Sequence, residues 1–116
     1  MSEVPKVKVG DIFYESWGYD QTNIDFVKVI GLTKSGKTAI CRMMGEKIVS
    51  TEGLAPLAEY IVPDGEYGEP FRLRVKVSVH NNELYLVGTY PFCDISKRFG
   101  YFWRWEERPV YQSHYA

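Results

Sequence analysis

The clearest pattern in the chain is the strict alternation of hydrophobic and polar side chains over residues 71–79. A period of two residues places one set of side chains on each face of a β-strand, and a helix does not have this period. The next residues, His-Asn-Asn-Glu at 80–83, tolerate the positive φ of a tight turn, and an apolar segment follows at 84–90. The pattern therefore predicts a β-hairpin over residues 71–90.

Weaker patterns predict strands in the first half of the chain. Valines two residues apart lead into a Gly-Asp turn and an apolar-aromatic strand that ends at Tyr14. Residues 24–30 also alternate, and we expect Ile24 and Phe26 to face the core, with Val27 and Val29 on the opposite face. A turn at 34–37 leads into residues 38–44. These three segments predict an antiparallel meander.

The remaining segments are less regular. Residues 47–50 resemble a strand, whereas residues 54–60 suit either a short helix or an irregular segment, since Pro56 fits only the first turn of a helix. Residues 63–70 concentrate turn formers and acids and predict an exposed loop, the best internal break in the chain. Toward the C-terminus, aromatic residues at 101–105 precede a turn at 106–109 and a last short strand at 110–115.

Together these segments predict an all-β domain of six to eight short strands, covering residues 1–116. The preferred architecture is a small antiparallel SH3-like barrel or a sandwich-like domain. The alternative is a β-rich α+β fold with one short helix within residues 50–60.

Composition agrees with a small globular β domain. A chain of 116 residues with 45% hydrophobic and 25% charged residues is long enough to bury one core, and 16% aromatic content favours strands. The net charge of −1 gives no global attraction to polyanions, so a nucleic-acid site would have to be local. No apolar run is long enough to span a bilayer, and the first residues lack a signal-peptide core. We therefore expect a cytoplasmic protein with no membrane association.

Cysteine and histidine are too sparse to predict a metal or a cofactor. Cys41 and Cys93 are the only cysteines, with no CxxC spacing, so neither a disulfide framework nor a zinc site is indicated. Cys41 lies in a predicted strand and is expected to be an inert thiol. His80 and His114 have no metal-ligand spacing.

Residues 31–38, Gly-Leu-Thr-Lys-Ser-Gly-Lys-Thr, match the P-loop pattern G-x-x-x-x-G-K-[ST]. That motif binds phosphate only if a helix begins near its second glycine, and here Gly45 interrupts the apolar segment that follows. A hairpin turn that matches the pattern by chance is favoured over nucleotide binding.

Three acids, Glu15, Asp20 and Asp25, surround the aromatic-rich segment 13–26. A pair of carboxylates can carry acid–base chemistry, but neither a nucleophile nor a histidine accompanies them in the sequence. Asp20 is better explained as a turn residue. We therefore expect no enzymatic activity and no catalytic residue.

A basic strand face is one candidate binding site. Arg72, Arg74 and Lys76 would lie about 7 Å apart along one strand, near the phosphate spacing of a nucleic acid. Lys97, Arg98 and Arg104 could extend this face, and Tyr85, Tyr101 and Trp103 could stack bases beside it. The simpler interpretation, which the sequence favours, is a solvated outer face whose charges prevent edge pairing.

The segment Ser-Trp-Gly-Tyr-Asp-Gln-Thr-Asn-Ile-Asp-Phe at 16–26, with Gly-Lys-Thr at 36–38 and the Trp105–Tyr115 region, resembles small proteins carried by phages, plasmids and other bacterial or archaeal mobile elements. Those proteins have an Asp-Gly turn before Lys-Pro, where this chain has Glu-Glu-Arg-Pro at 106–109. The resemblance implies an accessory role in a mobile element. It carries no established activity, so it transfers no catalytic residue.

The leading hypothesis from the sequence is a non-enzymatic binding module that recognises a protein partner through aromatic and polar side chains. The candidate partner-binding residues are Trp17, Tyr19, Gln21, Asn23, Tyr111 and Tyr115. The alternative is local nucleic-acid binding through Arg72, Arg74, Lys76 and Arg104.

Overall fold

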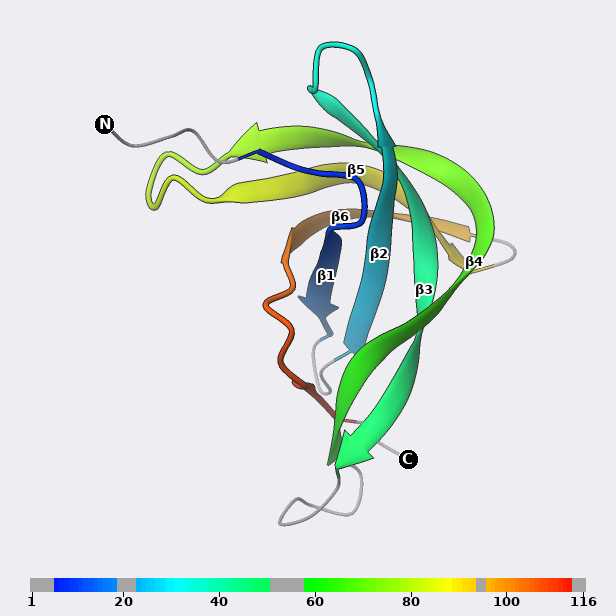
Figure 1. Cartoon of the computed structure of the whole chain (residues 1–116). Coiled ribbons are helices and arrows are strands. Elements are labelled where there is room, and N and C mark those ends of the chain that lie inside the picture. The colour runs from blue at the N-terminus through cyan, green and yellow to red at the C-terminus, as the bar shows by residue number, and fades with distance from the viewer. Residues whose placement is uncertain (1–5, 19–22, 51–57, 94–95, 114–116) are drawn as a thin grey trace.

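The computed structural model describes residues 6–18, 23–50, 58–93 and 96–113, in which seven strands pair in antiparallel fashion (Figure 1). The strands are β1 (Ile12–Trp17), β2 (Asn23–Leu32), β3 (Thr38–Ser50), β4 (Ala58–Val77), β5 (Leu84–Cys93), β6 (Ser96–Arg104) and β7 (Val110–Ser113). The order in the sheet is β3-β2-β1-β6-β5-β4-β7, and pairing of β3 with β4 closes the first six into a barrel. The prediction of a small all-β barrel is confirmed.

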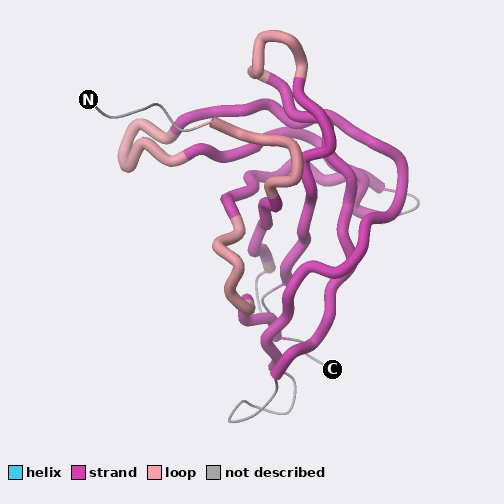
Figure 2. The backbone as a smooth tube through the Cα atoms, viewed as in Figure 1, coloured by secondary structure: helices cyan, strands magenta, loops and turns pink. Residues whose placement is uncertain are grey.

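No part of the described chain is helical, as Figure 2 shows. The alternative α+β fold placed a helix within residues 50–60. Of these, 51–57 lie outside the described residues, and 58–60 begin β4. No described segment forms a helix that is long and apolar enough to cross a membrane.

The barrel interior is filled by side chains from all six barrel strands. Its fully buried members include Phe13, Val27, Val29, Cys41, Leu73, Leu86, Tyr90 and Phe102. The predicted orientation of β2 was wrong, because Val27 and Val29 face this interior. Ile24 and Phe26 lie on the other face, in a second cluster with Tyr14, Trp105 and Val110. Both faces of β2 are buried, so its alternation could not distinguish inside from outside.

The predicted loop at residues 63–70 was also wrong, because these residues are part of β4, which curves around the barrel in Figure 1. The pairing with β3 shifts between Cys41 and Met43 and again between Met44 and Gly45. Gly65 and Gly68 lie at these shifts with φ of 74° and 77°. The turn-forming residues therefore make β-bulges that bend a long strand instead of ending it.

The predicted hairpin and meander are confirmed. β4 and β5 pair from Arg74–Val87 to Val77–Leu84, and Asn82 in the turn has a φ of 57°. β1, β2 and β3 are neighbours in the sheet. Residues 33–37, within the P-loop-like string, form the turn between β2 and β3, and no helix follows them. The phosphate-binding geometry of a P-loop is therefore absent from this part of the described chain.

Candidate functional site

The outer face of β4, β5 and β6 brings together cationic and aromatic side chains from distant parts of the chain. Leu73 of β4, Leu86 of β5 and Phe102 of β6 point into the barrel. Their immediate neighbours along each strand therefore point outward. Cross-strand pairing aligns the outward residues in rows. One row is Arg74–Val87–Tyr101, and the next is Lys76–Tyr85–Trp103.

Aromatic rings form a continuous exposed stripe on this face. Tyr85 lies 4.9 Å from Trp103 and 6.2 Å from Tyr101, measured between ring centroids, and Phe99 lies 5.6 Å from Tyr101. Phe99, Tyr101 and Trp103 remain 58%, 53% and 37% exposed. Large aromatic side chains that stay this exposed side by side mark a binding surface more often than a folding requirement.

The cations beside this stripe are available to a ligand. Arg72, Arg74 and Lys76 are exposed, and none of them forms an ion pair with another described residue. The outward positions of β5 and β6 add exposed Lys97 and no acid. We name this surface, made of Arg72, Arg74, Lys76, Tyr85, Lys97, Phe99, Tyr101 and Trp103, the basic–aromatic face.

Two of the cations predicted to extend this face do not belong to it. Arg104 lies over the Phe13 ring, 5.7 Å from its centroid, and donates to the Lys6 carbonyl at 3.1 Å and to Asp11 Oδ2 at 3.3 Å. Arg98 donates from Nε and Nη2 to Glu15 Oε1, at 3.1 and 2.9 Å. Both lie on the inward side of β6, because they share the phase of Phe102.

The turn between β2 and β3 adds positive charge at the edge of the basic–aromatic face. Thr38 pairs with Arg74, and the Val75 amide donates to the Lys37 carbonyl at 2.9 Å. Lys34 and Lys37 are exposed at the tip. The tip projects beside the C-terminal half of β4 in Figure 1. The P-loop-like lysines therefore lie near the cations of β4.

Two open pockets border the aromatic stripe on its β1 side, and Tyr14 and Trp103 line both of them. The smaller pocket, about 360 Å³, also contacts Ser16, Trp17, Arg98 and Tyr101. The larger pocket, about 720 Å³, extends from the β4–β5 turn, at Asn82 and Glu83, to the C-terminal segment, at Trp105, Glu106, Arg108 and Tyr111. A ligand on the stripe would thus have room for groups that extend beyond β6.

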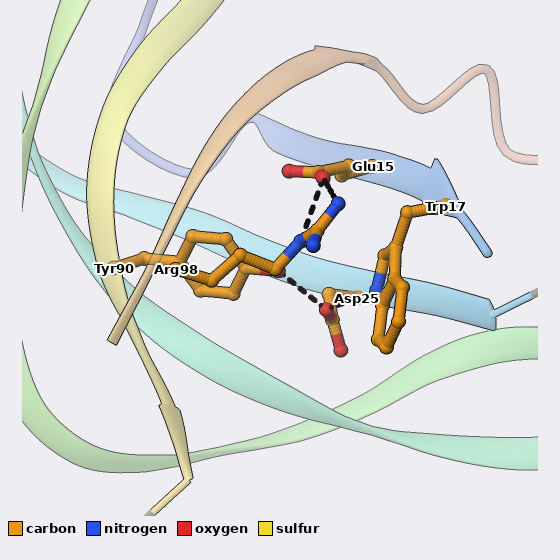
Figure 3. A network of polar contacts seen from close by, with 5 residues as sticks. All are labelled: Glu15, Trp17, Asp25, Tyr90 and Arg98. Carbon is orange, nitrogen blue, oxygen red and sulfur yellow. Dashed lines mark hydrogen bonds and ion pairs between the residues drawn. The ribbon is translucent and has the colours of Figure 1, made fainter. Parts of the chain in front are cut away.

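A polar network fills the opening where β1 and β6 separate beyond Tyr14 and Trp103 (Figure 3). Asp25 Oδ2 accepts hydrogen bonds from the Tyr90 hydroxyl at 2.6 Å and from the Trp17 indole at 2.8 Å. The Arg98 guanidinium lies 4.4 Å from the centroid of the Trp17 ring while it pairs with Glu15. Glu15 and Asp25, two of the three acids that the sequence marked as candidates for an acid–base pair, are thus each engaged by structural donors.

Burial dominates the electrostatics of this network. It raises the pKa of Glu15, against the opposing effect of Arg98, and the nearby Asp25 charge raises it further. Glu15 Oε2 makes no well-formed hydrogen bond within the described residues, although the Tyr101 amide favours the charged form. Burial and the hydrogen bond to Asp25 also raise the pKa of Tyr90. The Tyr90 hydroxyl therefore stays protonated near neutral pH and can donate to Asp25 Oδ2.

The predicted partner-binding residues are only partly described. Tyr19, Gln21 and Tyr115 lie outside the described residues. Trp17 is half-buried in the polar network, Asn23 pairs with it at the end of the β1–β2 ladder, and Tyr111 is exposed and packs edge-on against Tyr60. Recognition of a protein through this set therefore stays a prediction.

The cysteine and histidine whose side chains the structure describes, Cys41 and His80, do not form a reactive or metal-binding site with other described residues. Cys41 is fully buried, and burial raises the pKa of its thiol to about 12. His80 is exposed in the β4–β5 turn, whereas Asp20 and His114 lie outside the described residues. In the described ranges, no group of His, Cys, Asp and Glu side chains has the arrangement of a metal site.

The stripe on the basic–aromatic face was only partly found from the sequence. Tyr85, Tyr101 and Trp103 were expected beside the cations, but Phe99 was missed, although its two-residue spacing from Tyr101 was a usable signal. Comparison with known proteins adds no assignment: no family model, curated protein or solved structure matches the chain.

Proposed function

We propose that the protein is a binding module for single-stranded nucleic acid and that the basic–aromatic face is its binding surface. The observation that carries the proposal is the row alignment of cations on β4 with exposed aromatic rings on β5 and β6. Proteins that bind single strands combine a positive track for the backbone with aromatic side chains on which bases stack.

The local charge explains how a protein with a net charge of −1 would bind a polyanion. Arg72, Arg74, Lys76 and Lys97 lie on one face with no acid among its outward positions, and Lys34 and Lys37 lie at its edge. Acids elsewhere pair with other cations, as Glu66 does with Lys28 at 3.1 Å. The attraction would be local and therefore sensitive to salt.

The structure also favours single strands over duplexes. Exposed rings can stack only on bases whose faces are free, as they are in a single strand and not inside a duplex. Because stacking is tolerant of sequence, the proposal predicts little base preference.

The test is fluorescence anisotropy with a labelled oligothymidine of about twenty nucleotides, at several salt concentrations, with a duplex of equal length for comparison. We expect single-strand binding that weakens as salt rises, and at least a tenfold loss for the variant carrying R74A and K76A. The matched control is Lys47→Ala. It removes an exposed cation from the half of β3 that pairs with Val62, away from the half that pairs with Arg74. Absence of binding at low salt, or binding that does not respond to salt, would refute the proposal.

Recognition of a protein partner is the competing function. Its residues would include Trp17, Asn23 and Tyr111, and the resemblance to mobile-element proteins would make the module an accessory factor of such an element. A pull-down from nuclease-treated lysate distinguishes the two: a discrete partner that persists with wild-type protein and is lost with a folded Trp17→Ala variant supports protein recognition.

A further inference from the structure

The cations of β4 and the aromatic rings of β6 form two columns on the basic–aromatic face, and both columns repeat every two residues. Cations occupy alternate residues of β4, and aromatic rings occupy alternate residues of β6. Alternate residues of a strand are about 7 Å apart. This repeat is comparable with the phosphate separation of an extended single strand.

Pairing through β5 places the two columns in step. Arg74 lies in the row of Tyr101, and Lys76 lies in the row of Trp103. Arg72 and Phe99 lie two residues farther along their strands, in the same direction. The two paired rows thus each provide one cation and one aromatic ring, and Arg72 and Phe99 continue the same two strands beyond the last β4–β5 pair.

The distance across the face suits a nucleotide. β4 and β6 are separated by two inter-strand spacings, about 10 Å in total, with β5 between them. A phosphate held over β4 can therefore belong to a nucleotide whose base lies over β5 and β6. The smaller pocket, lined only by residues of β1 and β6, lies on the side of β6 away from the cations of β4, where base edges would extend.

We infer that a single strand lies along β4, β5 and β6 in an extended form, with one nucleotide for each two residues of the sheet. Its phosphates contact Arg72, Arg74 and Lys76, and the bases of the same three nucleotides stack on Phe99, Tyr101 and Trp103. This inference rests on the proposed function. It adds that the nucleic acid runs parallel to the β-strands and that the site holds three nucleotides. A strand that crossed the sheet would meet only one cation of β4 and one ring of β6.

The salt dependence of binding distinguishes a nucleic acid that runs along the β-strands from one that crosses them. Each phosphate contact to a single strand contributes about 0.7 to the slope of log K against log salt. Replacing Arg72, Arg74 and Lys76 with alanine should therefore reduce the slope by about 2 if the strand runs along the sheet, and by about 0.7 if it crosses. Lys47→Ala is again the control and should leave the slope unchanged.

A second measurement uses wild-type protein, so it does not depend on the folding of a variant. Among strands of equal length that are otherwise abasic, one that keeps three consecutive bases should bind about tenfold more tightly than one that keeps two, and a fourth base should add no more than about twofold. Binding of the complete oligothymidine with a slope change near 0.7, or equal affinity for the two- and three-base strands, would overturn the inference and leave the proposed function intact. Failure of the complete strand to bind would instead refute the proposed function.

Discussion

Lys76 on β4 and Trp103 on β6 lie in one row of the sheet, paired through Tyr85, whose ring is 4.9 Å from the Trp103 ring. A cation and a stacking platform from separate segments are thus held at a fixed separation by backbone hydrogen bonds. Because the scaffold sets the geometry, a bound strand would not have to order the protein first.

Tyr101 should contribute directly to binding. Tyr101→Ala removes a ring that is 53% exposed, and we expect a loss of about 1–3 kcal/mol in binding free energy, or roughly 5- to 150-fold in affinity. Tyr67, also 53% exposed, lies on the part of β4 that pairs with β3 and is a matched control. Anisotropy titrations with oligothymidine measure both variants, and equal losses would argue against stacking on the stripe.

Gly100 should be intolerant of a side chain. An added Cβ would overlap Glu15 Oε2 and approach Tyr90 Cε1 to 3.0 Å, so Gly100→Ala should lower the free energy of unfolding by at least about 2 kcal/mol. Gly31→Ala is the control, because its Cβ would meet Ile40 Cδ1 at an ordinary 3.5 Å. Urea denaturation measures the difference. In a Glu15→Ala background, Gly100→Ala should cost less free energy of unfolding than in the wild type, and an equal cost in both backgrounds would contradict the proposed overlap.

Glu15 should make stability depend on pH in a defined direction. Burial raises its pKa in the folded state above the ordinary value of 4.5, so the folded protein binds this proton more tightly than the unfolded chain. The stabilising contribution is therefore complete below the unfolded pKa and is lost as pH rises through the raised folded pKa. Urea denaturation between pH 4 and pH 8, compared with Glu15→Gln, isolates this contribution. A wild-type advantage that grows with pH would show that Arg98 outweighs burial.

Cys41 should be inert in the folded protein. Its side chain is fully buried and its thiol pKa is raised to about 12, so native protein has neither access nor thiolate at neutral pH. In a Cys93→Ser background, a thiol reagent should modify Cys41 at least about a thousandfold faster in urea than in buffer. Rapid modification in buffer would mean that the barrel opens locally at β3.

Several elements of the fold could be predicted from the sequence. The two errors arose where packing or pairing with distant residues outweighed the local pattern. The β4–β5 hairpin was predicted because the outward side chains of residues 71–79 are polar, which preserves the two-residue period, and because turn residues at 80–83 precede an apolar segment. The two faces of β2 were assigned in reverse, because Trp105 and Val110 cover the face opposite the barrel interior and bury it as well. The glycines and prolines of residues 63–70 predicted a loop, since local turn preference does not distinguish a turn from a bulge in a paired strand.

The same distinction applies to the candidate site. The sequence by itself determined that this chain is a small all-β domain and that Arg72, Arg74 and Lys76 share one face of a strand, because strand period is a local property. Only the tertiary structure decided which rings lie beside those cations and that Arg98 and Arg104 turn inward toward Glu15 and Phe13. Register between strands depends on closure of the barrel and on the packing of both faces, and no local pattern encodes these non-local constraints.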